Sequence, residues 1–300
     1  MYHAPVLERD SCTLGPGVDL MRLSEASTRF VVARGQEGYS RHTLAAYRLQ
    51  HELLIRDVGD LDLSSVTLDD LRDHLSRQDH LKPSSRGHKV RAIKSLFRWC
   101  EDENLVQPNP ARKLKEPKSG QRVPKALNMD ELEWLRDSCR NAFEHALIEF
   151  FFATGCRVGE VVRLNHTDVD WQRGCVVVVG KGNKEREVYF GSKARIWLGR
   201  YLRGRNDTDP ALFVTQRAPH RMTIHGIQGV FKRVARRCGL ESKVHPHVMR
   251  HTLATSLLNQ GAPLAAVQSI LGHEKPETTQ LYAVLSGESR HQTYQRYFVQ

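Results

Sequence analysis

The chain has 300 residues and a hydrophobic content of 40%, which is ample for ordinary cores and suits two domains better than one. It carries 45 Lys and Arg against 34 Asp and Glu, and the resulting net charge of +11 favours an anionic partner, most commonly nucleic acid. A secretory signal, an apolar run of roughly 20 residues and a CxxC pair are all missing from the sequence, so we expect a cytoplasmic protein with free thiols and no membrane partner.

The N-terminal part of the chain predicts a flexible arm followed by an all-helical domain. Residues 1–18 form the expected arm, because prolines and glycines interrupt any helical pattern there. Residues 19–105 show apolar residues at helical spacing between polar capping signals. Four helices are therefore expected, at about residues 19–34, from Ser40 or Thr43 to Val58, from Thr67 onward, and at about residues 84–103.

The fourth predicted helix carries a concentrated basic run. Residues 82–98 contain six basic side chains and no acidic one, and the apolar residues among them follow helical spacing, so the charges lie largely on the remaining face. A solvated surface is the plainer interpretation, but such a surface usually mixes both signs. We therefore expect contacts to the DNA backbone from Lys82, Arg86, Lys89, Arg91, Lys94 and Arg98.

Residues 106–125 are predicted to form a basic, proline-rich linker between two domains. Four prolines argue against a helix, and the basic side chains, Lys113 and Lys115 among them, suit a strap along a polyanion. Residues 1–120 carry 19 Lys and Arg against 17 Asp and Glu, a net charge of +2. The remaining +9 of the total +11 therefore belongs to residues 121–300.

Residues 126–300 predict a second domain that combines helices with a small antiparallel sheet. Its first expected elements are a helix at about 129–139 capped by Asn128, an apolar helix at 142–154, and strands at 175–179 and 186–190 around the glycine-rich turn 180–184. Helices are expected to dominate the remainder, with starts at Pro246, Pro263 and Pro276 and ends at Gly261 and Gly272. The fold class of the chain is thus mainly α with a small antiparallel β-sheet.

Six polar residues in the second domain form an ordered set of cations, proton carriers and one tyrosine. A guanidinium meets two phosphate oxygens with a rigid pair of N–H groups, which a lysine cannot do. A histidine transfers protons near neutral pH, and a phenol becomes nucleophilic when cations stabilise its developing charge. The set suits attack by a tyrosine on a phosphodiester, and its members are Arg157, Lys181, His247, Arg250, His273 and Tyr282.

The segments around these residues resemble the tyrosine recombinase family, which includes phage integrases and the Xer recombinases. They read Ala-Thr-Gly-Cys-Arg-Val-Gly-Glu at 153–160, Gly-Lys-Gly-Asn-Lys-Glu-Arg at 180–186, His-Val-Met-Arg-His at 247–251, Leu-Gly-His at 271–273 and Thr-Thr-Gln-Leu-Tyr at 278–282. Five matches in the same order are far more specific than any one of them. The resemblance implies a helical core-DNA-binding domain at 19–105 and an α+β catalytic domain at 126–300.

By this resemblance the chain is expected to be a site-specific recombinase acting on paired recombination sites in double-stranded DNA. It would cut and rejoin strands through a 3′-phosphotyrosine and a Holliday junction, without metal, ATP or other cofactor. Integration, excision and resolution of mobile DNA or replicon dimers all remain open. The C-terminal tail 283–300 would join four copies into a homotetramer on DNA, associated with the nucleoid and encoded by a bacterium, a phage or a mobile element.

The resemblance also assigns roles to the basic residues and the tyrosine. Arg157 and Arg250 would clamp the phosphate, and Tyr282 would be the nucleophile. Lys181, in the hairpin turn, would act as the general acid that protonates the departing 5′-oxygen. Lys184 lies three residues further along the same turn and is the competing general acid.

The histidines have a catalytic and a metal-binding interpretation. The resemblance makes His247 a proton-transfer and phosphate-binding residue and places His273, nine residues before the tyrosine, at a phosphate oxygen. A zinc site of these two with His245, His251 and Cys238 is the alternative. Neither a His-Glu-x-x-His pattern nor a CxxC pair supports it, so we expect no metal.

Structural explanations compete with the catalytic ones. Arg157 has an ion-pair partner three residues on, Glu160, which would also orient it. Tyr282 has apolar neighbours and would suit a core position, and Tyr294 and Tyr297 are alternative nucleophiles without the family's context. At the level of the whole chain, a type IB topoisomerase or a non-catalytic DNA-binding regulator on the same fold are the alternatives to a recombinase.

Overall fold

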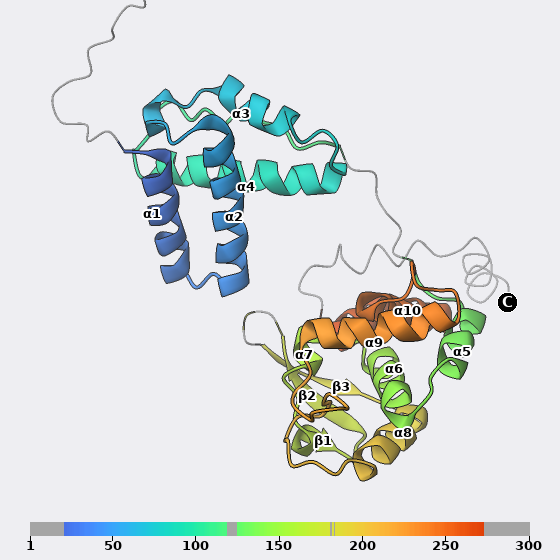
Figure 1. Ribbon diagram of the computed structural model, residues 1–300. Helices are drawn as coiled ribbons and strands as arrows, with labels where there is room; N and C mark the ends of the chain where they lie inside the picture. Colours follow the sequence, from blue (N-terminus) through green and yellow to red (C-terminus); the bar gives the residue numbers. More distant parts are fainter. Residues whose placement is uncertain (1–20, 119–124, 181, 183, 273–300) are drawn as a thin grey trace, which may run out of the picture. The chain divides into compact units, whose positions relative to one another are not determined.

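The computed structural model describes residues 21–118, 125–180, 182 and 184–272. The chain divides into two compact units, Met1–Gln121 and Arg122–Gln300 (Figure 1). Each unit has a buried hydrophobic core of its own. Within the described ranges, none of the helices combines the length and hydrophobicity that a membrane-spanning segment needs.

The first unit is built from helices around one core. Its elements are α1 (Leu23–Gln36), α2 (Arg41–Val58), the 3₁₀ helix η1 (Leu63–Ser65), α3 (Leu68–Ser76) and α4 (Pro83–Asp102). Phe30 of α1, Leu54 of α2 and Phe97 of α4 are fully buried in this core. Helix α4 is amphipathic: one face is apolar and includes Ile93 and Leu96, and another face carries most of the basic run.

The second unit combines helices with a three-stranded sheet. Its elements are α5 (Met129–Asp137), α6 (Ala142–Thr154), α7 (Val158–Val161), η2 (His166–Asp168), β1 (Val169–Asp170), β2 (Cys175–Val179), β3 (Glu185–Tyr189), α8 (Ser192–Arg203), α9 (Ile224–Arg237), α10 (Pro246–Asn259) and α11 (Leu264–Leu271). The strand order is β1-β2-β3, and both pairings are antiparallel. Val179 of β2 faces Glu185 of β3 directly before the hairpin turn. This register fixes the base of the turn that contains Lys181.

Helix α6 is the central element of the second unit. It packs against both α8 and α10 (Figure 1). Phe150 and Phe151 are fully buried on it, as expected for a helix that is predominantly apolar. The helix ends at Gly155, whose φ of 58° is left-handed. A glycine adopts this conformation without strain, and it turns the chain directly into the segment that carries Arg157.

Three helix starts match the caps predicted from the sequence. The hydroxyl of Ser40 accepts a hydrogen bond from the first turn of α2. Thr67 forms a capping box with Asp70 at the start of α3, and Asn128 forms one with Glu131 at the start of α5. Local hydrogen bonding therefore determines where these helices begin.

The predicted class, mainly helical with a small antiparallel sheet, is confirmed, and the boundaries differ by small amounts. The helix expected at 129–139 ends at Asp137, and the second strand begins at Glu185, one residue earlier than expected. Pro263 is the N-cap of α11 and lies outside its first turn. The sheet also contains β1, which was not predicted because two residues show no alternation of polarity.

Candidate active site

Arg157 lies at the N-cap of α7, two residues after the left-handed Gly155. Its side chain is 37% exposed, so it is open to a ligand. Nη1 donates to Glu160 Oε1 at 2.9 Å, and the backbone N–H of Arg157 donates to Glu160 Oε2 at 2.8 Å. The predicted ion pair therefore exists, and it anchors the arginine at both its backbone and its side chain.

Glu160 binds a second arginine, Arg186 of β3, as well as Arg157. The two Nη atoms of Arg186 donate to the two carboxylate oxygens at 2.9 and 2.7 Å, which is a bidentate pair. The Glu160 side chain is only 3% exposed. Burial alone would raise the pKa of Glu160, but the hydrogen bonds from Arg186 and Arg157 outweigh it and lower the pKa to about 2.

Arg250 lies on α10 and is buried. Its Nη1 donates to the carbonyl oxygen of Gly155 at 2.7 Å, and its Nη2 donates to that of Leu271 at 2.5 Å. These bonds join α10 to the end of α6 and to the end of α11. The second predicted arginine is therefore held beside the segment that carries Arg157.

His247 lies one turn before Arg250 on α10 and is partly accessible to solvent. Removal of water by the surrounding protein lowers the pKa of His247, and the positive charges of His245, Arg250 and Arg157 lower it further. Those charges act on one imidazole, so the structure brings His247, Arg250 and Arg157 into one electrostatic environment. The imidazole is consequently neutral at pH 7.

The two other histidines of this region do not form a metal site with His247. Burial and the charges of His247 and His245 lower the pKa of His251 to about 4. The rings of His245 and His247 lie 6.3 Å apart, centroid to centroid. Among the described residues, no group of three His, Cys, Asp or Glu side chains is placed to hold a metal ion.

The hairpin turn is described at its base and at Gly182, but not at Lys181 and Asn183. The backbone N–H of Gly180 donates to the carbonyl oxygen of Lys184 at 2.8 Å and closes the turn. Arg163, which follows α7, donates to the carbonyl oxygen of Val179 at 2.6 Å. Lys181 lies outside the described residues, so the choice between it and Lys184 as general acid stays a prediction.

Two further predicted residues, His273 and Tyr282, also lie outside the described residues. The last described residue before them is Gly272, the left-handed C-cap of α11 that the sequence predicted. A methyl group on Gly272 would lie 2.6 Å from Cδ of Arg186. The chain that leads to His273 thus leaves α11 against the side chain that holds Glu160.

The side chain of Arg157 is open to a phosphate oxygen, and Arg250 is held beside it by the carbonyl oxygens of Gly155 and Leu271. Two guanidinium groups and a neutral imidazole lie at the junction of α6, α7 and α10. Guanidinium groups held in place stabilise charge that develops on phosphate oxygens, and a neutral imidazole accepts a proton.

The sequence did not predict the role of Arg186. This residue ends the segment quoted at 180–186, but we interpreted it as an ordinary strand residue.

The basic residues predicted to contact DNA belong to the first unit and differ in exposure. Lys82, Arg91 and Arg98 of the basic run and the two linker lysines, Lys113 and Lys115, are exposed. Arg91 also pairs with Glu116. The other three have partners within the unit too: Arg86 pairs with Asp79, Lys89 donates to Gln50, and Lys94 donates to the carbonyl oxygen of Leu114.

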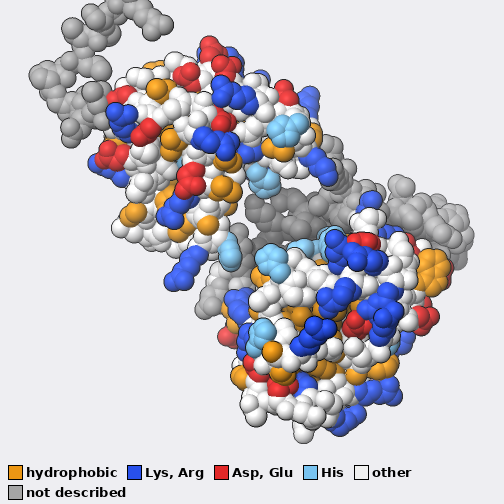
Figure 2. Space-filling view, viewed as in Figure 1, with side chains coloured by type: hydrophobic (Ala, Val, Ile, Leu, Met, Phe, Trp, Pro, Cys, Tyr) orange, Lys and Arg blue, Asp and Glu red, His pale blue; other side chains and the backbone are white. Residues whose placement is uncertain are grey.

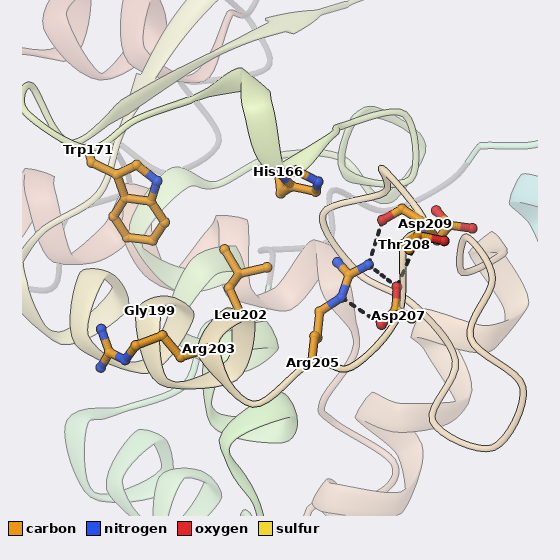
Figure 3. Close-up of a pocket in the computed structure, with 9 residues that line it drawn as sticks. All are labelled: His166, Trp171, Gly199, Leu202, Arg203, Arg205, Asp207, Thr208 and Asp209. Atoms are coloured by element: carbon orange, nitrogen blue, oxygen red, sulfur yellow. Dashed lines mark hydrogen bonds and ion pairs between the residues drawn. The ribbon is translucent and has the colours of Figure 1, made fainter.

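The second unit has a cavity that lies apart from the predicted catalytic residues that the structure describes. Its volume is about 490 Å³, and it lies beside the end of α8 (Figure 3). Trp171, His166 and Leu202 contribute to its wall, and Arg205 is held there by Asp207. The predicted catalytic residues that the structure describes are not among its lining residues, so we do not assign the reaction to this cavity.

Comparisons with known proteins identify the family of the chain. Residues 125–288 match the model of the phage integrase family. The chain is 37% identical to tyrosine recombinase XerD of Ralstonia nicotianae over 281 residues, which cover 88% of this chain and 91% of the relative. It is 34% identical to tyrosine recombinase XerC of Oceanobacillus iheyensis over 279 residues, with coverage of 87% and 91%.

The fold is shared with a lambda integrase dimer solved on a COC′ core site. The TM-score is 0.74 at 18% identity, and the match covers 89% of this chain and 97% of the integrase chain. The family match and the XerC and XerD relatives define an enzyme that breaks and rejoins DNA with a tyrosine. The chain belongs to the phage integrase family and is a tyrosine site-specific recombinase, as the sequence motifs predicted.

Proposed function

We propose that this recombinase cuts and rejoins double-stranded DNA by attack of Tyr282 on a phosphodiester that Arg157 and Arg250 hold. The observation that carries the proposal is the convergence of the two arginines. Arg250 is bonded to Gly155, two residues before Arg157, and both positive charges act on His247. A tyrosine on the chain after Gly272 is the nucleophile that the family motif supplies.

The reaction is a transesterification in which no bond energy is lost. The Tyr282 oxygen bonds to phosphorus as the bond to the 5′-oxygen breaks, which gives a 3′-phosphotyrosine and a 5′-hydroxyl. His247, neutral at pH 7, takes the phenolic proton, and Lys181 gives a proton to the 5′-oxygen. His273 hydrogen-bonds the phosphate. The arginines supply the charge stabilisation that a divalent cation supplies in other phosphoryl transfers, and the retained ester bond makes ATP unnecessary.

Both units are proposed to contact the duplex. Residues 19–105 would be the core-DNA-binding domain behind the arm 1–18, and 106–125 the linker to the catalytic domain 126–300. Exposed Lys82, Arg91 and Arg98, together with Lys113 and Lys115, suit contacts to phosphates. In the second unit, Figure 2 shows Lys and Arg side chains gathered on the face in view.

Four copies are proposed to assemble on two recombination sites and to exchange strands in pairs through a Holliday junction. The tail 283–300 would pack on a neighbouring copy, with Leu285, Tyr297, Phe298 and Val299 as apolar anchors. A chain that ends at Ser286 should then cleave its site but fail to synapse two sites, as measured by native gel electrophoresis. Normal synapsis by the shortened chain would overturn this assembly.

The chemistry is tested with nicked suicide substrates. The fragment released by cleavage diffuses away, so the strands cannot be rejoined and the covalent intermediate accumulates. A covalent adduct at the 3′ end is expected from the unsubstituted chain and from Tyr297→Phe, and none from Tyr282→Phe. Relaxation of any supercoiled plasmid would instead identify a topoisomerase. The absence of an adduct with every candidate site would identify a DNA-binding regulator.

A further inference from the structure

We propose that Arg186 is a positioning residue of the recombinase, which acts through Glu160 to fix the base of the hairpin of the general acid to the element of Arg157. Arg186 lies on β3, two residues after Lys184, and Glu160 lies on α7, three residues after Arg157. The inference rests on the proposed function, because it concerns the delivery of the general acid to the site described above.

The first step is the bond between the two elements. Both oxygens of Glu160 accept from Arg186, at 2.9 and 2.7 Å, and the Oε1 atom also accepts from Arg157 at 2.9 Å. The side chains of Arg186 and Glu160 are 13% and 3% exposed. One buried carboxylate therefore connects the strand of the general acid to the phosphate-binding arginine, with geometry that two parallel N–H bonds define.

The second step is the position of the turn relative to this pair. A methyl group on Gly180 would lie 3.3 Å from Nη1 of Arg186 and 3.7 Å from Oε1 of Glu160. Gly180 directly precedes Lys181, and its N–H is bonded to the carbonyl oxygen of Lys184. The turn therefore begins at Gly180 against the Arg186–Glu160 pair, and the bond between Gly180 and Lys184 closes its base there.

The third step is the contact with the end of α11. Gly272 is left-handed, with φ of 63°, and a methyl group there would lie 2.6 Å from Cδ and 3.0 Å from Nε of Arg186. That Nε is buried and has no hydrogen-bond partner within the part of the chain that the structure describes. Arg186 thus packs tightly under the residue before His273, so one side chain adjoins three of the predicted catalytic segments.

A lysine or a neutral residue at this position would not substitute for the arginine. A lysine presents a point charge and cannot meet both carboxylate oxygens with a rigid pair of N–H groups. A glutamine would leave the buried carboxylate with one cation in place of two, which is costly. Glu187, the residue after Arg186 on β3, pairs with Arg173. This ion pair differs from the Arg186–Glu160 pair because its arginine side chain is exposed. Arg173→Gln is therefore the matched control.

The test compares cleavage of two DNA substrates that differ in one atom, the bridging 5′-oxygen or a sulfur in its place. A departing thiolate, with a pKa of about 8.5 for a thiol, needs no proton, whereas a departing alkoxide does. Loss of general-acid delivery therefore slows cleavage of ordinary DNA and spares the sulfur substrate. The ratio of the two rates on one preparation is also independent of how much of the protein is folded.

Arg186→Gln should slow cleavage of ordinary DNA by about 10²-fold and raise the sulfur-to-oxygen rate ratio at least about tenfold over the unsubstituted chain. Glu160→Gln should raise the same ratio, and the double variant should raise it no further. Arg186→Lys should give an intermediate ratio, and Arg173→Gln should leave it unchanged.

A sulfur-to-oxygen ratio in Arg186→Gln equal to that of the unsubstituted chain would overturn the positioning role, whatever the loss of rate. An equal rise of the ratio in Arg173→Gln would overturn it too. Failure of the proposed function gives a different result, because the unsubstituted chain then forms no adduct, or forms one that persists in Tyr282→Phe.

Discussion

Replacement of Glu160 by glutamine tests the electrostatic centre of the site. The carboxylate is buried, and its two arginine partners lower its pKa from 4.5 to about 2. Each unit of pKa corresponds to about 1.4 kcal/mol, so the ionised form should contribute about 3 kcal/mol to the free energy of unfolding at pH 7. Glu160→Gln should lose at least this amount, because its amide also directs an N–H toward the arginines.

The sign of the pH dependence follows from the lowered pKa. The contribution is complete above pH 4.5, the carboxyl's ordinary pKa, and it is lost as the pH falls toward about 2. The difference in unfolding free energy between the unsubstituted chain and Glu160→Gln should therefore be full at pH 7 and smaller by about 2 kcal/mol at pH 3. Urea denaturation at the two pH values measures it.

Glu187→Gln is the control for this experiment. Glu187 is on the same strand as Arg186, but its carboxylate pairs with an exposed arginine, and such pairs contribute little. The substitution should leave the unfolding free energy almost unchanged. A loss below about 1 kcal/mol in Glu160→Gln at pH 7, or a loss that does not shrink by pH 3, would refute the reasoning.

Three further predictions concern neighbouring residues. Arg250→Lys should lower the single-turnover rate of adduct formation by about 10²–10³, since a lysine cannot reproduce the fork of a guanidinium. Burial and positive neighbours hold the pKa of His247 below 6.5, so the decline of the cleavage rate with falling pH should have its midpoint below pH 6.5, and His247→Gln should remove that decline. Gly155→Ala should lower the free energy of unfolding by roughly 1–3 kcal/mol in urea denaturation, because the added methyl would lie 2.9 Å from Leu253 and Leu271 at a left-handed position.

The sequence predicted those parts of the fold that depend on local interactions. The starts of α3 and α5 follow from side chains that bond to the backbone three residues away, as at Thr67 and Asn128. The end of α11 follows from a glycine that adopts a left-handed conformation at 272. Elements too short to show a period, such as β1, could not be predicted this way.

Of the candidate site, the sequence named Arg157, His247 and Arg250, which the structure describes, but not Arg186 or the contacts that connect the elements. Arg157 and Glu160 are three residues apart, so their ion pair could be anticipated from helical spacing. Arg186 is 26 residues from Glu160, and alternation along β3 does not say which strand face meets α7. The contact of Arg186 with Gly272 depends on how α11 packs, which only the folded chain reveals.

The most direct test of the central claim is to identify the residue that becomes bonded to DNA. The adduct from a nicked suicide substrate is digested with protease and nuclease, and the modified peptide is sequenced by mass spectrometry. The account predicts a nucleotide on Tyr282, linked through its 3′-phosphate, and a free 5′-hydroxyl on the other strand end. A nucleotide on Tyr294 or Tyr297, or a linkage through a 5′-phosphate, would contradict it.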